Sequence, residues 1–267
     1  MAAGAPTAEL LTIGDEILLG ETLDTNGRDL ARALRAVGVA VVRMTSVGDD
    51  VAVIAAAVRE AAGRAGIVIT TGGLGPTFDD PTRDAVAAAA GVATEFVPGL
   101  WEHIMAYFAG RGRTPTDNNK AQAYIPHGAE IIPNPVGSAP AFAVTIGGAY
   151  VICLPGVPHE MHHLVEHAVL PLLRRRFGLS ERLFVRTLHC SGAGESAIDD
   201  AIGAAVAAVP PDGPLRVGLA AHQGSVDVRL TARAADRAGA DALLGPLEAA
   251  LRERLGGWVV GVEDGER

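Results

Sequence analysis

The sequence predicts an α/β protein, with a mostly parallel sheet covered by helices on both faces, followed by a small α+β domain. In residues 8–176, short apolar runs alternate with segments of helical periodicity. Such alternation requires right-handed crossovers between parallel strands, which place helices on both faces of one sheet. After Gly178 the order of the elements changes. We therefore expect two domains, residues 1–178 and residues 179–267, and the second has a plausible domain size.

The elements of the first domain follow from apolar runs, cap residues and helix-ending glycines. Continuously apolar runs are typical of buried parallel strands, and apolar residues at helical spacing indicate helices. The expected strands are 8–14, 39–48 and 66–70, and the expected helices are 28–38, 51–62, 81–91, 98–109, 117–123 and 158–176. Two apolar runs around Gly147-Gly148 predict a hairpin, so an antiparallel element joins the sheet.

The second domain is predicted from four successive patterns. The stretch LFVRTLHCSGAGESAIDDAIGAAVAAV is typical of strand, loop and helix, and LRVGLAAHQGSVDVRLTARA of two strands around a turn. A helix over residues 238–255 and the apolar run WVVGV follow. These patterns predict a separate small α/β unit.

Composition limits the partners and the compartment. The net charge of −9 disfavours a surface for duplex nucleic acid, which needs a basic face, but does not disfavour nucleotides, because a metal ion can supply positive charge. Cys153 and Cys190 have no metal-like spacing and indicate no disulfide framework, which suits a reducing cytoplasm. The first residues carry no signal-peptide pattern and no apolar run spans a membrane, so we expect a cytoplasmic protein without a membrane partner.

Residues 69–84, ITTGGLGPTFDDPTRD, place a glycine-rich loop between a strand and a helix. Gly72, Gly73 and Gly75 let the backbone approach a ligand and turn N–H groups toward it, and the following helix start favours an anion. The loop also follows a strand, at the edge where open α/β sheets bind ligands. A tight turn without any ligand explains the glycines equally well, and the spacing matches neither the dinucleotide fingerprint nor the P-loop.

Asp79 and Asp80 favour a ligand-binding loop over a tight turn without a ligand. Either carboxylate alone is an ordinary partner for a helix start, but two together would repel a phosphate unless a divalent cation lay between them. Mg²⁺ is held in this way, through one or two carboxylates and phosphate oxygens. The pair therefore predicts a metal ion that bridges to a phosphate on the glycine loop.

Three further groups are candidates for the same site. Asp15, Glu16 and Asn26 follow the first strand, as the glycine loop follows the third, so the two loops can share one edge of the sheet. The alternative for Asn26 is helix capping or solvent exposure. The stretch NPVGSAP (134–140) offers polar contacts but also reads as ordinary turns. Lys120, the single lysine, is either a phosphate contact or a solvated surface residue.

Four stretches resemble, in the same order, the competence/damage-inducible protein A (CinA) family. They are GDEILLGETLDTN, TTGGLGPTFDDPTRDAV, NKAQAYIPHGAEIIPNPVGSAPAF and LPGVPHEM. The resemblance implies that the first domain has the molybdopterin-binding fold of the MogA/MoaB type. The later stretch SGAGESAIDDAI…VRL is similar to that family's KH-like middle domain. The sequence given stops after it, so we do not expect the family's nicotinamide mononucleotide deamidase activity.

The resemblance implies a metal-dependent pyrophosphatase that cleaves ADP-ribose to AMP and ribose 5-phosphate, with Mg²⁺, Mn²⁺ or Co²⁺ as cofactor. The expected metal-binding and catalytic residues are Asp80, Asp79 and Glu16, with Lys120 as a further catalytic residue. The expected substrate-binding residues are Gly14, Asp15, Asn26, Thr71, Gly72, Gly73, Gly75, Thr77, Asn134, Gly137, Ser138, Pro155, Gly156 and Glu160. Ser138 stands where the family more often has Thr, and Ala141 where it often has Gly. Relatives self-associate, so we expect a homo-oligomer, a dimer or larger.

Three other functions stay open at this stage. The first is molybdopterin binding or adenylylation, because related domains share the loop. The second is a binding protein without catalysis, in which Asp79 or Asp80 could be lost without changing ligand affinity. The third is RNA binding by the small domain, which its acidic excess and its lack of a GXXG loop between helices both disfavour.

Overall fold

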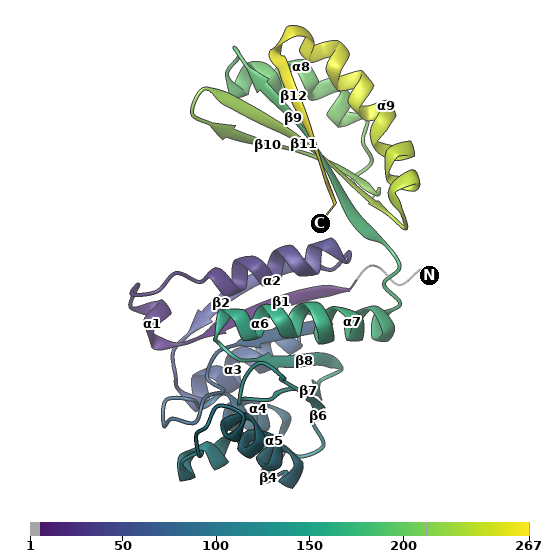
Figure 1. Cartoon of the computed structure of the whole chain (residues 1–267). Coiled ribbons are helices and arrows are strands. Elements are labelled where there is room, and N and C mark those ends of the chain that lie inside the picture. The colour runs from purple at the N-terminus through teal and green to yellow at the C-terminus, as the bar shows by residue number, and fades with distance from the viewer. Residues whose placement is uncertain (1–5, 212, 267) are drawn as a thin grey trace. The chain divides into compact units, whose positions relative to one another are not determined.

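The structure is a computed structural model that describes residues 6–211 and 213–266. Its contacts divide the chain into two compact units, which are shown in Figure 1. The first unit comprises the residues up to Leu34 and Val39–Phe177. The second comprises the residues from Gly178 onward with the stretch Arg35–Gly38. The main division, between Phe177 and Gly178, lies within one residue of the expected boundary.

The first unit is built on a six-stranded sheet with the strand order β2-β1-β3-β8-β7-β6. Its parallel strands are β2 (Ala40–Val47), β1 (Thr7–Ile13), β3 (Ile67–Thr71) and β8 (Ala149–Leu154). Two further strands, β7 (Ala141–Ile146) and β6 (Glu130–Ile132), add antiparallel pairing at one side. The β7–β8 hairpin turns at Gly147 and Gly148, whose φ angles of 58° and 95° favour glycine. The predicted parallel sheet with an antiparallel hairpin is therefore confirmed.

Helices cover both faces of this sheet (Figure 1). One face carries α2 (Thr25–Ala36), α6 (Pro158–Leu164) and α7 (Leu170–Phe177), and the other side carries α3 (Val51–Ala62), α4 (Thr82–Ala90) and α5 (Pro98–Ala109). Alternate residues of β1 serve the two faces, as the pleat of a strand requires. Leu11 and Ile13 join the core that contains Ile54 and Val58 of α3.

The structure differs from the prediction in several short elements. Four of them lie in segments for which no helix or strand was predicted: α1 (Asp15–Leu18), β4 (Thr94–Phe96), β5 (Tyr124–Pro126) and β6. Three or four residues carry too little periodicity to be recognised. Asp117–Ala123 forms a 3₁₀-helix rather than an α-helix, and the helix predicted from Pro158 contains a π-helical segment, Val165–Val169. The hydrophobic pattern does not distinguish these helix types.

The second unit is a four-stranded antiparallel sheet in the order β10-β11-β9-β12, packed against two helices. Its elements are β9 (Arg182–Ser191), α8 (Glu195–Ala207), β10 (Leu215–His222), β11 (Ser225–Ala234), α9 (Arg237–Leu255) and β12 (Val259–Glu266). Every second residue of β11, including Val226, Val228 and Leu230, enters a core that also contains Ile198 of α8 and Leu244 of α9. The predicted small α+β domain is confirmed.

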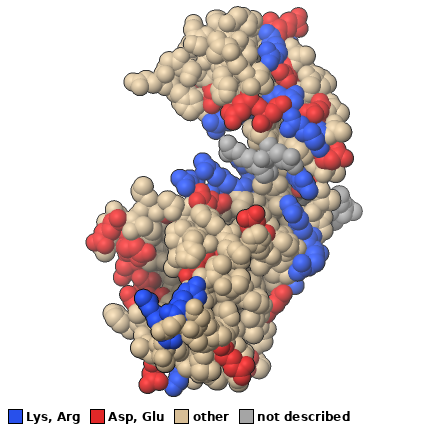
Figure 2. Space-filling view, in the orientation of Figure 1, with Lys and Arg blue, Asp and Glu red and all other residues tan. Residues whose placement is uncertain are grey.

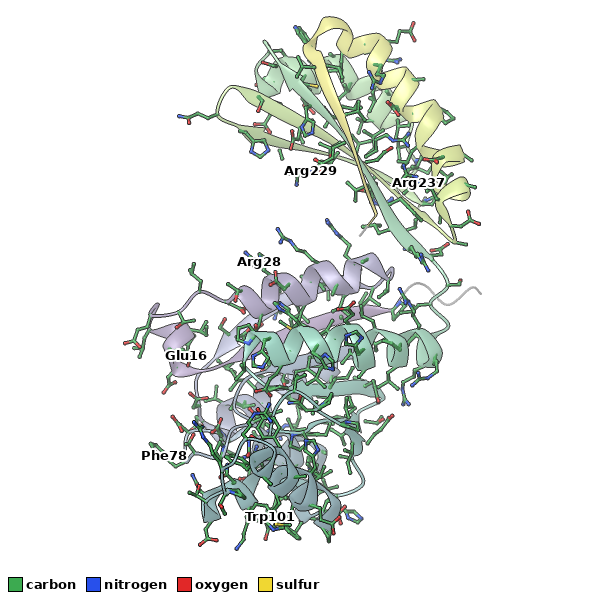
Figure 3. The ribbon with its side chains drawn as sticks, in the orientation of Figure 1. Glu16, Arg28, Phe78, Trp101, Arg229 and Arg237 are labelled. Atoms are coloured by element: carbon green, nitrogen blue, oxygen red, sulfur yellow. The ribbon has the colours of Figure 1, made fainter. Side chains whose placement is uncertain are left out.

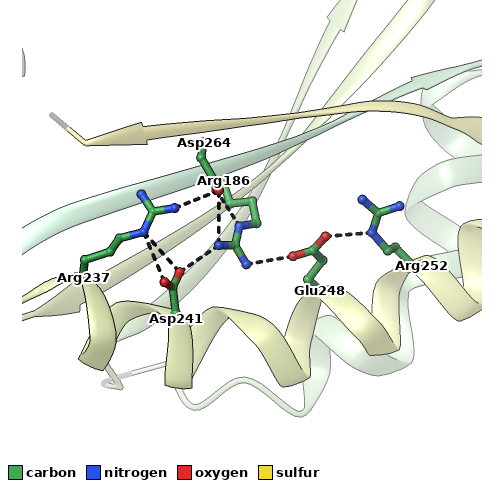
Figure 4. A network of polar contacts seen from close by, with 6 residues as sticks. All are labelled: Arg186, Arg237, Asp241, Glu248, Arg252 and Asp264. Atoms are coloured by element: carbon green, nitrogen blue, oxygen red, sulfur yellow. Dashed lines mark hydrogen bonds and ion pairs between the residues drawn. The ribbon is translucent and has the colours of Figure 1, made fainter.

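An ion-pair network fastens α9 to the sheet of this second unit (Figure 4). Arg186 of β9 is mostly buried and donates to Asp264 of β12 and to Asp241 and Glu248 of α9, over 2.6–2.8 Å. Arg237 also donates to Asp264, at 2.8 Å. Arg186 thus connects two strands and a helix through a single side chain.

Candidate functional site

A pocket of about 470 Å³ lies at the carboxyl ends of three parallel strands of the first unit. Its walls come from the segments that follow β1, β3 and β8. Open α/β sheets bind their ligands at this edge, because the connections there diverge to opposite faces. Of the residues expected at the site, the pocket is lined by Gly14, Glu16, Asn26, Thr71, Gly72, Gly73, Gly75, Thr77, Asp79, Asp80, Ser138, Pro155, Gly156 and Glu160.

The glycine loop after β3 makes the floor of the pocket. Gly72 and Gly73 have φ angles of 110° and 65°, which other residues rarely adopt. A Cβ atom at Gly72 would overlap the carbonyl oxygen of Ile13, and one at Gly73 would overlap the hydroxyl of Thr82. Both glycines are therefore needed for conformation and for close packing.

The N–H groups of Gly73 and Leu74 are free donors at the start of this loop. The carbonyl of Gly72 accepts from the Thr82 hydroxyl at 2.8 Å, and that of Gly73 accepts from the Thr82 N–H at 3.1 Å. In trans peptides the N–H points opposite to the preceding carbonyl, so the next two N–H groups face away from α4. No acceptor for either of them lies among residues 6–211 and 213–266. Consecutive free N–H groups of this kind form an anion-binding nest.

Asp80 organises the loop. One carboxylate oxygen accepts from the Gly75 N–H at 2.7 Å, and the other accepts from the Thr77 N–H at 2.8 Å and from the Thr77 hydroxyl. A Cβ atom at Gly75 would overlap this carboxylate. The arrangement favours a loop-organising role for Asp80 over the direct metal ligation expected from the sequence.

The other carboxylates form an acidic edge, which we define as Asp15, Glu16, Asp49 and Asp79. Asp15 and Asp49 exchange hydrogen bonds, each carboxylate accepting from the other's N–H at 2.9–3.2 Å. Burial raises the pKa of Asp49, and the charges of Asp15, Glu16 and Asp79 raise it further. Figure 2 shows Asp and Glu side chains gathered on the side where α1 lies, and Figure 3 shows Glu16 there. Like charges held together in this way attract a cation.

Asn26 connects three segments at the pocket. Although it lies in the first turn of α2, its amide group donates to the Thr71 hydroxyl at 3.0 Å and to the Gly156 carbonyl at 2.8 Å. The helix cap is instead Asp24, whose carboxylate accepts from the Gly27 N–H at 2.7 Å. The amide oxygen of Asn26 is buried and has no partner among the described residues. Asn26 is thus a site residue rather than a cap, with an acceptor left over.

Glu160 of α6 closes the pocket on the side of the third loop. Its carboxylate accepts from the buried Asn134 side chain at 2.6 Å, and burial raises the pKa of Glu160. A Cβ atom at Gly137 would overlap Glu160 and Asn134. Asn134 and Gly137 therefore support the site from behind, while Ser138 lines it.

Lys120 is not brought to the site. Its ammonium group pairs with Asp117 at 3.0 Å, lies 5.9 Å from the Trp101 ring centre and is outside the pocket lining. The 3₁₀-helix turns this side chain toward solvent, which corrects the expectation of a phosphate contact. Asp15 also lies outside the lining, although it exchanges hydrogen bonds with Asp49, which lines the pocket.

Two residues of the pocket region escaped the sequence analysis as functional candidates. Asp49 follows β2, whose carboxyl end lies at the same edge of the sheet as those of β1 and β3. An acidic residue directly after a predicted parallel strand could have been recognised as a candidate from the sequence. Arg83 in the first turn of α4 is buried and bonds the glycine loop, but no sequence pattern indicated it.

The pocket also contains acidic residues that are candidates for binding a divalent cation. Glu16, Asp49 and Asp79 line the same pocket as Gly73 and Leu74. No three acidic, histidine or cysteine side chains within the described ranges already form a cage for an ion. A cation held partly by the protein and partly by phosphate oxygens, as Mg²⁺ is, matches this arrangement.

Comparisons with known proteins agree with this fold. Residues 9–175 match the family described as "Probable molybdopterin binding domain", and residues 185–261 match "Damage-inducible protein CinA KH domain".

No helix in the part of the chain that is described is long and apolar enough to cross a membrane.

Individual relatives cover both units. A "CinA-like protein" of Frankia casuarinae is 43% identical over 96% of this chain, and a "Putative competence-damage inducible protein" of Symbiobacterium thermophilum is 40% identical over 96%. The chain spans 60% of the length of each. The crystal structure of CinA "with unknown function" from Thermoplasma acidophilum is similar over 64% of this chain and 98% of that one, with 35% identity and a TM-score of 0.56. With a molybdopterin-binding-type domain followed by a CinA KH domain, the chain belongs to the CinA-like family.

Proposed function

We propose that the first unit hydrolyses the diphosphate linkage of a nucleotide with the help of a divalent cation, Mg²⁺, Mn²⁺ or Co²⁺. ADP-ribose, cleaved to AMP and ribose 5-phosphate, is the proposed substrate. The observation that supports this best is the free N–H pair of Gly73 and Leu74 in the same pocket as the carboxylates of Glu16, Asp49 and Asp79. The pair suits phosphate oxygens, and the carboxylates suit the cation that a diphosphate carries.

In this proposal the residues have distinct tasks. The N–H groups of Gly73 and Leu74 stabilise the negative charge that develops on the attacked phosphate. Asp79 and Asp49 would hold the ion, and Glu16 would hold it as well or accept the proton of the attacking water. Asp80 keeps the loop in shape. When bound, the ion would polarise the diphosphate and lower the pKa of a water. Water adds to phosphorus, the anhydride P–O bond breaks, and two phosphate monoesters leave.

The test is phosphorus NMR of the protein with ADP-ribose, with each metal in turn and with chelator. We expect the diphosphate signal to be replaced by two monoester signals only with metal, and to persist with Asp79→Asn. Asp117→Asn is the matched control, because that carboxylate is exposed, lies outside the pocket and pairs with Lys120. A diphosphate signal that survives with every metal would refute hydrolysis of ADP-ribose.

Molybdopterin binding is the second candidate, favoured by the match of residues 9–175 to the probable molybdopterin binding domain. The unpaired acceptor of Asn26 suits a ligand N–H or hydroxyl, which a pterin also provides. Fluorescence titration with a pterin phosphate separates the two: saturable binding without any hydrolysis of ADP-ribose would support it.

A further inference from the structure

Four consecutive carbonyl groups of the glycine loop are tied to the first turn of α4. Two of them, from Gly72 and Gly73, accept from Thr82, as described above. The next two, from Leu74 and Gly75, accept from the Arg83 guanidinium at 2.7 and 2.8 Å. The two carbonyls bound by Thr82 belong to the peptides that carry the Gly73 and Leu74 N–H groups, and the two bound by Arg83 belong to the next two peptides of the loop, so Arg83 fixes the segment that directly follows these donors.

Arg83 is unusual because it is a buried arginine whose hydrogen bonds go to backbone carbonyls. Its side chain is only 6% exposed, and no carboxylate forms an ion pair with it in residues 6–211 or 213–266. Burial lowers the pKa of the Arg83 guanidinium, while the charges of Asp80 and Asp84 act in the opposite direction. An arginine stays charged in such surroundings. A full positive charge is therefore buried directly behind the loop.

Arg83 and Asp80 hold one peptide group between them. The Leu74–Gly75 peptide gives its carbonyl to Arg83 and its N–H to Asp80. Asp80 alone would place a negative charge beside a loop that must receive a negative ligand. The nearby guanidinium offsets that charge, so the loop keeps its shape without repelling phosphate.

We infer that Arg83 is a positioning residue for a phosphate or diphosphate ligand. It aligns the loop carbonyls away from the pocket and neutralises Asp80, although the carbonyls, not the ligand, receive its hydrogen bonds. The inference rests on the proposed function, because it needs the loop to bind phosphate groups.

The test is titration of the ¹⁵N-labelled chain with inorganic diphosphate in the presence of Mg²⁺, following the amide signals of Gly73 and Leu74. In the wild type we expect saturable shifts. Arg83→Met should weaken diphosphate binding by about tenfold or more, since a charge and two charge-assisted hydrogen bonds are lost. Arg59→Met is the matched control, because Arg59 also donates to a backbone carbonyl but is exposed and lies outside the pocket.

Chemical rescue separates positioning from a general loss of structure. Millimolar guanidinium chloride should restore most of the affinity of Arg83→Met, whereas tetramethylammonium chloride at equal ionic strength should not. Thermal unfolding shows whether the variant folds. If it does not, Arg83→Lys replaces it, and we expect weaker binding than wild type because one ammonium cannot reproduce the planar pair of contacts.

Each result has one meaning. Wild-type affinity in Arg83→Met or Arg83→Lys, or equal rescue by both salts, overturns the role of Arg83. An absence of any shift in the wild type overturns the phosphate-binding loop itself, and with it the proposed function. A weakened variant restored by guanidinium alone supports both.

Discussion

Asp79 and Asp80 are neighbours in the sequence, but their environments differ. Asp80 is enclosed by donors from Gly75 and Thr77, whereas Asp79 is exposed at the acidic edge. A carboxylate that accepts hydrogen bonds from the backbone holds a loop together, and one without donors is available to a cation. The two residues should therefore respond differently to substitution.

We predict that Asp80→Ala lowers the melting temperature and abolishes binding of diphosphate. The variant lacks the carboxylate that accepts from the Gly75 N–H, the Thr77 N–H and the Thr77 hydroxyl, so the loop is no longer held in its shape. Asp79→Asn should leave the melting temperature within about 1 °C of wild type, as surface substitutions usually do, and weaken Mn²⁺ binding. Calorimetric titration with Mn²⁺ and thermal unfolding measure both effects. Equal loss of stability in the two variants would contradict this division of roles.

The raised pKa of Asp49 leads to a prediction for stability against pH. A raised pKa means that the folded state prefers the protonated acid, so the ionised carboxylate is destabilising above that pKa. In metal-free buffer, Asp49→Asn should therefore raise the free energy of unfolding at pH 7–8. The gain should shrink as the pH falls and vanish below the ordinary value of 3.8. Urea unfolding across this range checks it, and Mn²⁺ should stabilise the wild type more than the variant.

At the scale of elements, β1 depends on the end of α3. Glu9 of β1 is 2% exposed, and Arg64 just beyond α3 donates to both of its carboxylate oxygens at 2.7 and 2.8 Å. The hydrogen bonds from Arg64 are the main reason that the pKa of Glu9 is lowered. The pair couples a central strand to the helix that covers it.

Arg64→Ala should lower the free energy of unfolding at pH 7, because a buried carboxylate loses its partner, and the loss should be moderate because Arg64 itself is partly exposed. A lowered acid pKa stabilises the fold above the ordinary value of 4.5, so the wild-type advantage should disappear as the pH falls through the lowered pKa. Glu60→Ala, which removes only an exposed partner of Arg64, should change little. A pH-independent loss in Arg64→Ala would count against the ion pair.

At the scale of the whole molecule, each unit has its own hydrophobic core, and an ion-pair network stabilises the second unit. The core of the second unit contains residues of β9, β11, α8 and α9, and the Arg186 network joins β9, β12 and α9 (Figure 4). The proposed site is built entirely from residues of the first unit. Damage to the second unit should therefore not remove the site.

We predict that Arg186→Met destabilises the second unit by about 2–4 kcal/mol, because partly buried carboxylates lose their common partner. Hydrogen exchange should accelerate in β9, β11 and β12 but not in β1, β3 and β8. Hydrolysis or binding at the pocket should be unchanged. Arg252→Met, which removes one exposed ion pair with Glu248, is the control and should have a small effect. Uniformly faster exchange across both units would contradict independent cores.

The sequence by itself determined the order of the elements, the parallel sheet, the hairpin at Gly147-Gly148 and the loops that meet at one sheet edge. These features are local, since they follow from periodicity, cap residues and glycines that act over a few residues. The resemblance of four stretches to one family was equally local in origin. It was enough to indicate the domain types that the comparisons then showed.

Only the tertiary structure decided what the individual polar groups do. Asp80 turned inward to the loop, Lys120 outward to Asp117, and Asn26 reached β3 and the segment after β8 instead of capping its helix. The role of Arg83 could not be predicted from the sequence, because its hydrogen-bond partners are backbone carbonyls and every residue type has one. Hydrogen bonds and charges act over a few ångströms in space, whatever the separation along the chain, so their partners are fixed only when the chain has folded.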